Sequence, residues 1–127
     1  MFVNTDLIPY TENLPDESLA PFFRKLTEQL AKDLYPVKWG DVSKTLTPRE
    51  IILNLEESVR ILIEEQNSSL GSILYRIDIP EGKIRALMAN TPSSERVKVL
   101  SAQIIEREAK KVWMRMHYSA PETGSDT

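Results

Sequence analysis

The hydrophobic positions of this chain repeat with a helical period over most of its length. Three long stretches carry the pattern, at residues 18–34, 48–66 and 92–118. In each stretch the apolar residues recur three or four positions apart, which places them on one side of an α-helix. A shorter region, 69–90, contains one or two further short helices. The pattern predicts an all-α fold, a small bundle of three main helices with short helices between the second and the third.

The first long stretch has a regular apolar stripe that ends before a proline. The stripe consists of Leu19, Phe22, Phe23, Leu26, Leu30 and Leu34. Pro21 has no backbone N–H and is best tolerated in a first helical turn, so we expect Ser18 to be the N-cap. Tyr35 precedes Pro36 and is therefore pushed out of the helical region, which ends the helix. In the connection that follows, Trp39 is expected to pin the loop over the core.

The second long stretch opens with a capping box. Thr47 and Glu50 stand three positions apart with Pro48 at the first helical position, a combination that marks a helix start. Its main stripe is Ile51, Ile52, Leu55, Val59, Leu62 and Ile63. Leu53 and Ile61 lie off this stripe. A helix with apolar residues on two sides is either central in the bundle or exposes a surface to a partner.

The last long stretch is the one around which the others are expected to pack. Thr91 and Pro92 predict its start, with Thr91 as the N-cap. At ~1.5 Å per residue it would be roughly 40 Å long, about as long as the domain is wide. Its broad apolar arc predicts contact with at least two other helices. The arc comprises Val97, Leu100, Ile104, Ile105, Ala109, Val112, Trp113 and Met116.

The region 70–90 fits two kinds of secondary structure. Residues 73–79 alternate as a strand would, and they also fit a short helix. We favour the helix, because one strand would have no partner elsewhere in the sequence. Pro80 then opens a second short helix whose apolar face holds Ile84, Leu87 and Met88.

The segment Ile73 to Met88 contains the run Ile79-Pro80-Glu81-Gly82. It resembles the helix-turn-helix in the fourth region of bacterial sigma factors and in related response regulators. The resemblance implies DNA binding, with Lys83 and Arg85 at positions that contact bases or phosphates. The sequence departs from the motif at Asp78, where glycine is usual, and at Leu74, where a small residue is needed.

The sequence also predicts the limits of the domain and the location of the protein. Residues 1–118 are expected to form a single helical domain, in which 1–15 is an extended N-terminal arm, and 119–127 to be a disordered tail. We expect no membrane span, because no apolar run approaches ~18 residues. Residues 1–15 do not have the pattern of a signal peptide. The sequence has no cysteine, which favours a cytoplasmic location.

Charge is distributed unevenly along the chain. The net charge is −3, but residues 1–66 hold 7 basic against 12 acidic residues, and residues 67–127 hold 9 against 7. An acidic half that packs beside a basic half would explain this distribution. A basic face for an anionic partner would explain it as well.

Side chains that could carry chemistry are sparse. His117 is the single histidine and has no Glu three or four positions away, so we predict no metal site. Glu56-Glu57 and Glu64-Glu65 are adjacent on a helix and point apart, which indicates a solvated acidic face. There is no glycine-rich phosphate loop. We predict no catalytic residues, no metal and no cofactor, and enzymatic activity is unsupported.

The sequence therefore favours a non-enzymatic helical protein that acts through protein–protein contact, in particular as a homodimer. The expected interface residues are Leu53, Ile61 and Trp113. The alternative is a DNA-binding regulator that uses residues 70–90, with Lys83 and Arg85 on the DNA. A third hypothesis is a small-molecule site at Trp39 or Trp113 in an apolar pocket.

Overall fold

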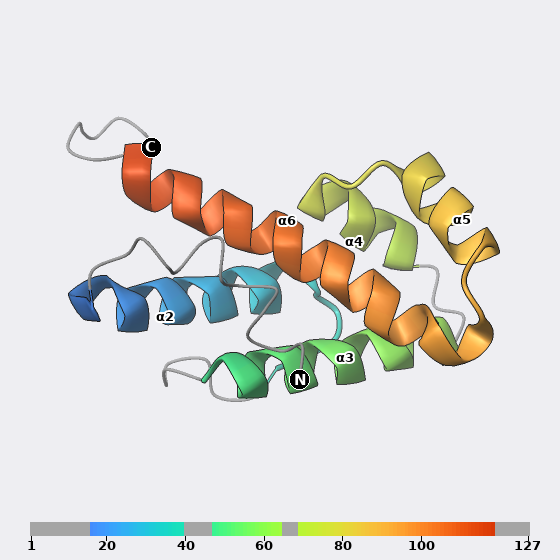
Figure 1. Ribbon diagram of the computed structural model, residues 1–127, viewed down its shortest axis with the longest axis horizontal. Helices are drawn as coiled ribbons and strands as arrows, with labels where there is room; N and C mark the ends of the chain where they lie inside the picture. The colour runs from blue at the N-terminus through green and yellow to red at the C-terminus, as the bar shows by residue number, and fades with distance from the viewer. Residues whose placement is uncertain (1–15, 40–46, 65–68, 119–127) are drawn as a thin grey trace.

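The computed structural model is all-α, as predicted (Figure 1). It describes residues 16–39, 47–64 and 69–118. The elements are α2 Asp16–Asp33, α3 Pro48–Glu64, α4 Ser69–Ile77, α5 Glu81–Ala89, the 3-10 turn η2 Ser93–Glu95, and α6 Arg96–Tyr118. Residues 70–77 are helical, so the helix interpretation of this region is confirmed. The expected arm 1–15 and tail 119–127 lie outside the described residues.

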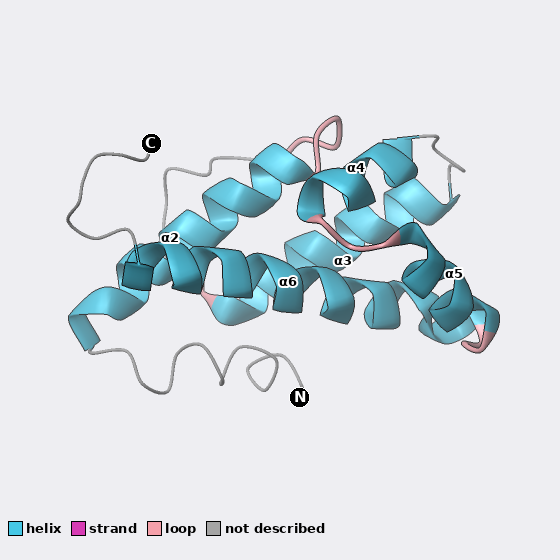
Figure 2. Cartoon of the chain, turned by 90° about the horizontal axis from the view of Figure 1, so that it is seen from above, coloured by secondary structure: helices cyan, strands magenta, loops and turns pink. Residues whose placement is uncertain are grey.

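Helix α6 is the element on which the others pack. It runs in the opposite direction to α2 and α3, crosses both, and also contacts α4 and α5 (Figures 1 and 2). The predicted contact with at least two other helices is therefore confirmed. The large, fully buried side chains come from α2 and the residue that follows it, from α3, from α4 and from α6. They are Phe22, Leu26, Leu30, Leu34, Ile51, Ile52, Leu55, Leu62, Ile73, Ile77 and Leu100.

The start of α2 differs from the prediction. The helix begins at Asp16, so Pro21 lies inside it and not in its first turn. The expectation that Ser18 is the N-cap was wrong. A proline at this position removes the hydrogen bond to the carbonyl of Glu17, four residues earlier. Glu17 is exposed, so water can reach this part of the helix and the loss is tolerable.

The start of α3 and the Trp39 loop agree with the sequence. The Thr47 N–H donates to Glu50 Oε1 at 2.8 Å, and the Glu50 N–H donates to Thr47 Oγ1 at 3.2 Å. These two bonds are the reciprocal pair of a capping box. Trp39 packs against the core, and its indole Nε1 donates to Ser58 Oγ at 2.8 Å. Trp39 therefore pins its loop onto α3.

The start of α6 also differs from the prediction. Thr91 is not its N-cap, because the Thr91 hydroxyl donates to the Leu87 carbonyl at 2.7 Å, on the end of α5. Pro92 precedes the 3-10 turn, and the α-helix begins at Arg96. The Thr91 carbonyl accepts a bond of 3.3 Å from Arg96 Nε. Thr91 therefore joins the two helices instead of starting the second.

None of the described helices combines the length and the apolar character needed to cross a membrane.

Candidate functional site

The turn between α4 and α5 contains a residue with left-handed backbone conformation. Asp78 has a φ of 75°, in the left-handed region that usually requires glycine. The Asp78 N–H donates to the Tyr75 carbonyl and the Ile79 N–H to the Leu74 carbonyl, both at 3.0 Å. These two bonds define a Schellman motif. Asp78 thus takes the backbone conformation that glycine has in the motif, and its carboxylate accepts a bond of 2.7 Å from Arg107.

The predicted DNA-contacting residues lie on the outer side of α5. Lys83 and Arg85 are exposed, while Ile84 between them is buried in the core. Leu74, which replaces the small residue of the motif, is also buried in the core. Helices α4 and α5 contact each other and both contact α6. The arrangement presents the two cations to the solvent together.

Two hollows of about 190 Å³ each lie on either side of the α4–α5 turn. The turn residues Asp78, Ile79 and Pro80 contribute to both. The hollow toward α6 is also lined by Lys83, Gln103, Glu106, Arg107 and Lys110. The hollow toward α4 is also lined by Gly71, Leu74, Tyr75 and Glu81. The first is therefore strongly charged, and the second has apolar walls with an exposed tyrosine at its edge.

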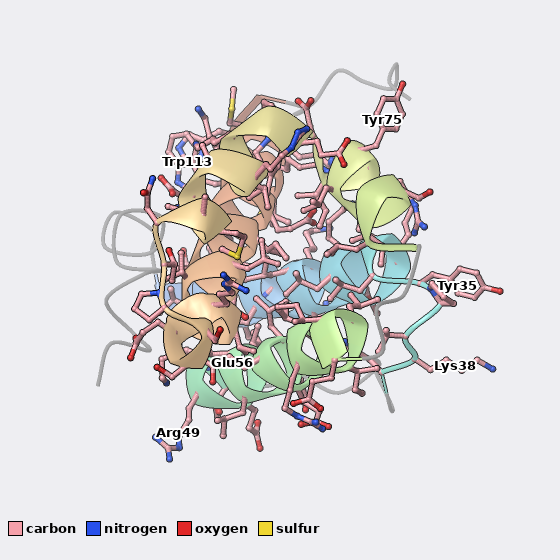
Figure 3. All side chains as sticks on the ribbon, turned by 90° about the vertical axis from the view of Figure 1, so that its right-hand side faces the viewer. Tyr35, Lys38, Arg49, Glu56, Tyr75 and Trp113 are labelled. Carbon is pink, nitrogen blue, oxygen red and sulfur yellow. The ribbon has the colours of Figure 1, made fainter. Side chains whose placement is uncertain are left out.

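An exposed surface with two tyrosines joins the ends of α2 and α4. Tyr35 is 61% exposed and Tyr75 is 86% exposed. Figure 3 shows both projecting from the same side of the molecule as Lys38. Lys32 and Arg76 are also exposed. We call these five residues, Lys32, Tyr35, Lys38, Tyr75 and Arg76, the tyrosine face.

Arg76 fixes the centre of the tyrosine face. Its guanidinium donates to the carbonyl of Asp33 at 2.9 Å and to the carbonyl of Tyr35 at 3.0 Å. A third bond, of 3.4 Å, reaches the carbonyl of Lys32. These carbonyls lie at the C-terminal end of α2, where a helix lacks internal donors and carries partial negative charge. Arg76 therefore caps α2 and ties it to α4.

Two carboxyl groups are buried beneath this surface. Asp33 of α2 is 4% exposed and Glu108 of α6 is 0% exposed, and their side chains are hydrogen-bonded to each other. Gln29 Nε2 donates to Asp33 Oδ2 at 2.8 Å. Lys111 Nζ lies 3.3 Å from Asp33 Oδ2 and 3.5 Å from Glu108 Oε2. Glu108 Oε1 is buried and has no hydrogen-bond partner.

The two carboxyl groups have opposite pKa shifts. Burial raises the pKa of Glu108 to about 8, with a further increase from its hydrogen bond to Asp33 and from the charge of Asp33. Burial also acts to raise the pKa of Asp33, but the hydrogen bonds from Glu108 and Gln29 and the charge of Lys111 hold it below its usual value. At neutral pH the pair therefore retains one proton, which resides on Glu108.

Lys111 links the buried pair to the tyrosine face. Besides contacting both carboxyl groups, its ammonium group donates to the Arg76 carbonyl at 3.3 Å. On the other side of the pair, Arg115 Nη1 donates to Gln29 Oε1 at 3.0 Å. The polar cluster thus connects α2, α4 and α6.

The residues expected at a protein interface are spread over the molecule. Leu53 is 49% exposed, whereas Ile61 is half-buried. Trp113 packs against the core and stacks on His117 with ring centroids 4.0 Å apart. Figure 3 shows Trp113 well away from Arg49, which lies one turn before Leu53 on α3. Leu53 is therefore the member of this set with a large exposed apolar surface.

Sequence reasoning missed the buried cluster, although the helical pattern held a signal. Glu108 stands four positions after Ile104 and four before Val112, so it belongs to the apolar arc of α6. Asp33 stands next to Leu34 and seven positions after Leu26, on the buried side of α2. An acidic residue in the core stripe of each of two helices indicates that the two meet, because an unpaired buried charge is too costly.

The chemistry available to this site is proton exchange and binding. Within 16–39, 47–64 and 69–118, no group of three His, Cys, Asp or Glu side chains could hold a metal ion. Glu57 and Glu64, from the acidic run of α3, are exposed and paired with Arg60.

Comparisons with protein-family models, with curated proteins and with solved structures gave no match.

Proposed function

We propose that this protein is non-enzymatic and acts by binding another protein chain through the tyrosine face. The observation that carries the proposal is the exposure of Tyr75 and Tyr35 on either side of Arg76. Tyrosine and arginine are enriched among the residues that dominate binding energy in protein interfaces. Because Arg76 is already held by α2 carbonyls, its side chain loses little conformational freedom when a partner binds.

The chemistry of the tyrosine face defines the partner surface that it fits. Its three charged members, Lys32, Lys38 and Arg76, are all cations. The neighbouring hollow at Tyr75 has apolar walls from Leu74, Ile79 and Pro80. A matching surface therefore presents carboxylates around an apolar side chain.

A second copy of the chain offers such a surface on α3. Leu53 is exposed there, with Glu50 three positions before it and Glu57 four positions after it, both also exposed. In a two-fold dimer each copy would place α3 against the tyrosine face of the other, so that both contacts form at once. As in the sequence prediction, the protein is a homodimer with Leu53 in the interface. The difference is that Leu53 now contacts the tyrosine face of the second copy.

We also propose a cytoplasmic location, which the lack of cysteine favours.

Sedimentation velocity over a range of concentrations tests the dimer. The wild type is expected to show a dimer that grows with concentration. Tyr35→Ala with Tyr75→Ala, and separately Leu53→Glu with Ile61→Glu, should give folded monomers. Met114→Ala is the matched control, because Met114 is 41% exposed and lies outside both surfaces. A wild type that remains monomeric at high micromolar concentration would reject the second copy as the partner.

Peptide display then tests a different protein partner. Random peptides selected on the wild type should be enriched in Asp and Glu around an apolar residue. The same peptides should fail to bind the variant that carries Tyr35→Ala and Tyr75→Ala. Peptides that bind this variant as well as they bind the wild type would contradict the tyrosine face as the binding surface.

A second candidate function, DNA binding through α5, is favoured by the left-handed Schellman turn at Asp78. Lys83 and Arg85 would then contact the duplex, and affinity should fall steeply with salt because phosphate contacts release counterions. Lys83→Ala with Arg85→Ala should abolish binding without affecting folding. Absence of duplex binding by the wild type at low salt would exclude this function.

A further inference from the structure

The buried carboxyl pair lies within hydrogen-bonding reach of the groups that hold the tyrosine face together. Lys111 Nζ contacts Asp33, Glu108 and the Arg76 carbonyl. Arg76 in turn holds the Asp33 and Tyr35 carbonyls. Three bonds therefore lead from Glu108 to Tyr35. The first, to Lys111, lies within α6, the second joins α6 to Arg76 of α4, and the third joins α4 to the residues that follow α2.

The Asp33–Glu108 pair binds one proton, and its surroundings stabilise two negative charges poorly. Asp33 and Glu108 face each other in the protein interior, and Glu108 Oε1 has no donor. Lys111 from α6 is the cation in contact with both. Arg76 from α4 reaches only the backbone of Asp33, Arg115 acts through Gln29, and no charged residue of the described part of α3 is among the groups that shift the pKa of either carboxyl.

Loss of the proton would leave two carboxylates in contact in a poorly solvated site. The repulsion between them is relieved when α2 and α6 separate enough for water to reach Glu108 Oε1. Such a movement carries the C-terminal end of α2 away from Lys111. Lys111 also donates a hydrogen bond to the backbone carbonyl of Arg76 in α4, so the contact between α2 and α4 is affected as well. The junction of α2 with α4, which is the tyrosine face, is then the part of the structure that loosens.

We propose that the Asp33–Glu108 pair is a proton-operated latch that keeps the tyrosine face ordered while the proton is bound and releases it when the proton leaves. The proposal rests on the proposed function for the meaning of the tyrosine face. The latch itself is a property of the free protein. A binding surface that is controlled by a proton would engage its partner at neutral or acidic pH and release it at alkaline pH.

Amide hydrogen exchange by NMR, combined with the titration of the Glu108 side-chain carboxyl carbon, tests the latch in the free protein. The Leu34 amide, bonded to the Leu30 carbonyl at 2.9 Å, reports on the end of α2. The Asp78 amide reports on the end of α4. The Ile51 amide, bonded to the Thr47 carbonyl at 3.0 Å, is the matched control on α3.

In the wild type, after correction for intrinsic exchange, protection at Leu34 and Asp78 should fall by up to about tenfold per pH unit between about pH 4.5 and the Glu108 midpoint of about 8, and should level off above that midpoint. Protection at Ile51 should stay constant. Glu108→Gln keeps the size of the side chain, cannot lose a proton, and should hold protection at Leu34 and Asp78 constant. Protection that stays flat in the wild type while Glu108 titrates would overturn the latch, as would an equal fall in Glu108→Gln.

If Glu108→Gln does not fold, the pH dependence of amide protection in the wild type, measured together with the Glu108 titration, still tests the latch. A Glu108 midpoint at the ordinary value of 4.5 would also overturn the proposal. The experiments are run without any other protein and at a concentration at which sedimentation shows a monomer, so a failure to find dimer or peptide binding leaves their outcome unaffected. Conversely, partner binding with pH-independent protection would reject the latch and leave the proposed function standing.

Discussion

Arg76 caps a helix other than its own, through a hydrogen bond of 2.9 Å from its guanidinium to the Asp33 carbonyl. Helix α4 thereby stabilises the C-terminal end of α2, which lies more than forty residues earlier in the chain. The cap uses the planar fork of the guanidinium, because adjacent donors reach the carbonyls of Asp33 and Tyr35.

Replacement of Arg76 by Ala should therefore lower the free energy of unfolding by about 1–2 kcal/mol, since partly buried carbonyls lose a charged donor. Arg76→Lys should recover less than half of this loss, because an ammonium group cannot bridge two carbonyls in the same way. Urea denaturation of the three proteins provides the measurement. Equal stability of wild type and Arg76→Ala would show that the cap contributes nothing.

The left-handed conformation of Asp78 predicts a difference between two substitutions that both remove its carboxylate. Asp78→Ala and Asp78→Gly each lose the ion pair with Arg107. This ion pair lies at the protein surface and contributes little to stability. Only Ala has a Cβ that opposes a φ of 75°. Asp78→Gly should therefore be more stable than Asp78→Ala by roughly 1 kcal/mol in thermal or urea unfolding. The opposite order would argue against the Schellman turn.

The capping box at Thr47 predicts a local effect. Thr47→Ala removes the acceptor for the Glu50 N–H and should cost about 1 kcal/mol. Urea unfolding monitored by circular dichroism measures this loss. Thr47→Ser retains the acceptor oxygen and serves as the control, with stability close to that of the wild type. An unchanged midpoint for Thr47→Ala would contradict the assigned cap.

The raised pKa of Glu108 predicts that stability falls as the pH rises. Below about pH 4.5 the side chain is protonated in the folded and in the unfolded chain. Between that pH and about 8 the unfolded chain loses the proton first, so each pH unit lowers the free energy of unfolding by about 1.4 kcal/mol. Asp33 has the opposite effect on stability. Its pKa is lowered in the folded protein, so its ionised form stabilises the fold, and this stability is lost only when the pH falls through the lowered pKa.

Glu108→Gln should remove the alkaline loss and be more stable than the wild type at pH 8, while the difference at pH 5 should be small. Chemical denaturation at several pH values measures both curves. Parallel curves for the two proteins would mean that Glu108 is not the group responsible.

The sequence was sufficient for the helices because their signals are local. The capping box at Thr47 and the apolar stripes of α3 and α6 depend on residues within a few turns of one another, and the structure confirms them. The start of α6 was misplaced because the Thr91 hydroxyl bonds back to α5, an alternative that the Thr-Pro pattern does not reveal. The tyrosine face and the buried pair depend on α2 meeting α4 and α6, which no spacing within a single helix encodes.

The dependence of α2 and α3 on α6 has a consequence for synthesis on the ribosome. Both helices bury their apolar faces mainly against α6 and contact each other far less. Because α6 is the last of the described helices to be translated, the faces of α2 and α3 stay uncovered until it emerges. We therefore expect the nascent chain to collapse late and nearly all at once, and to need protection from aggregation until then.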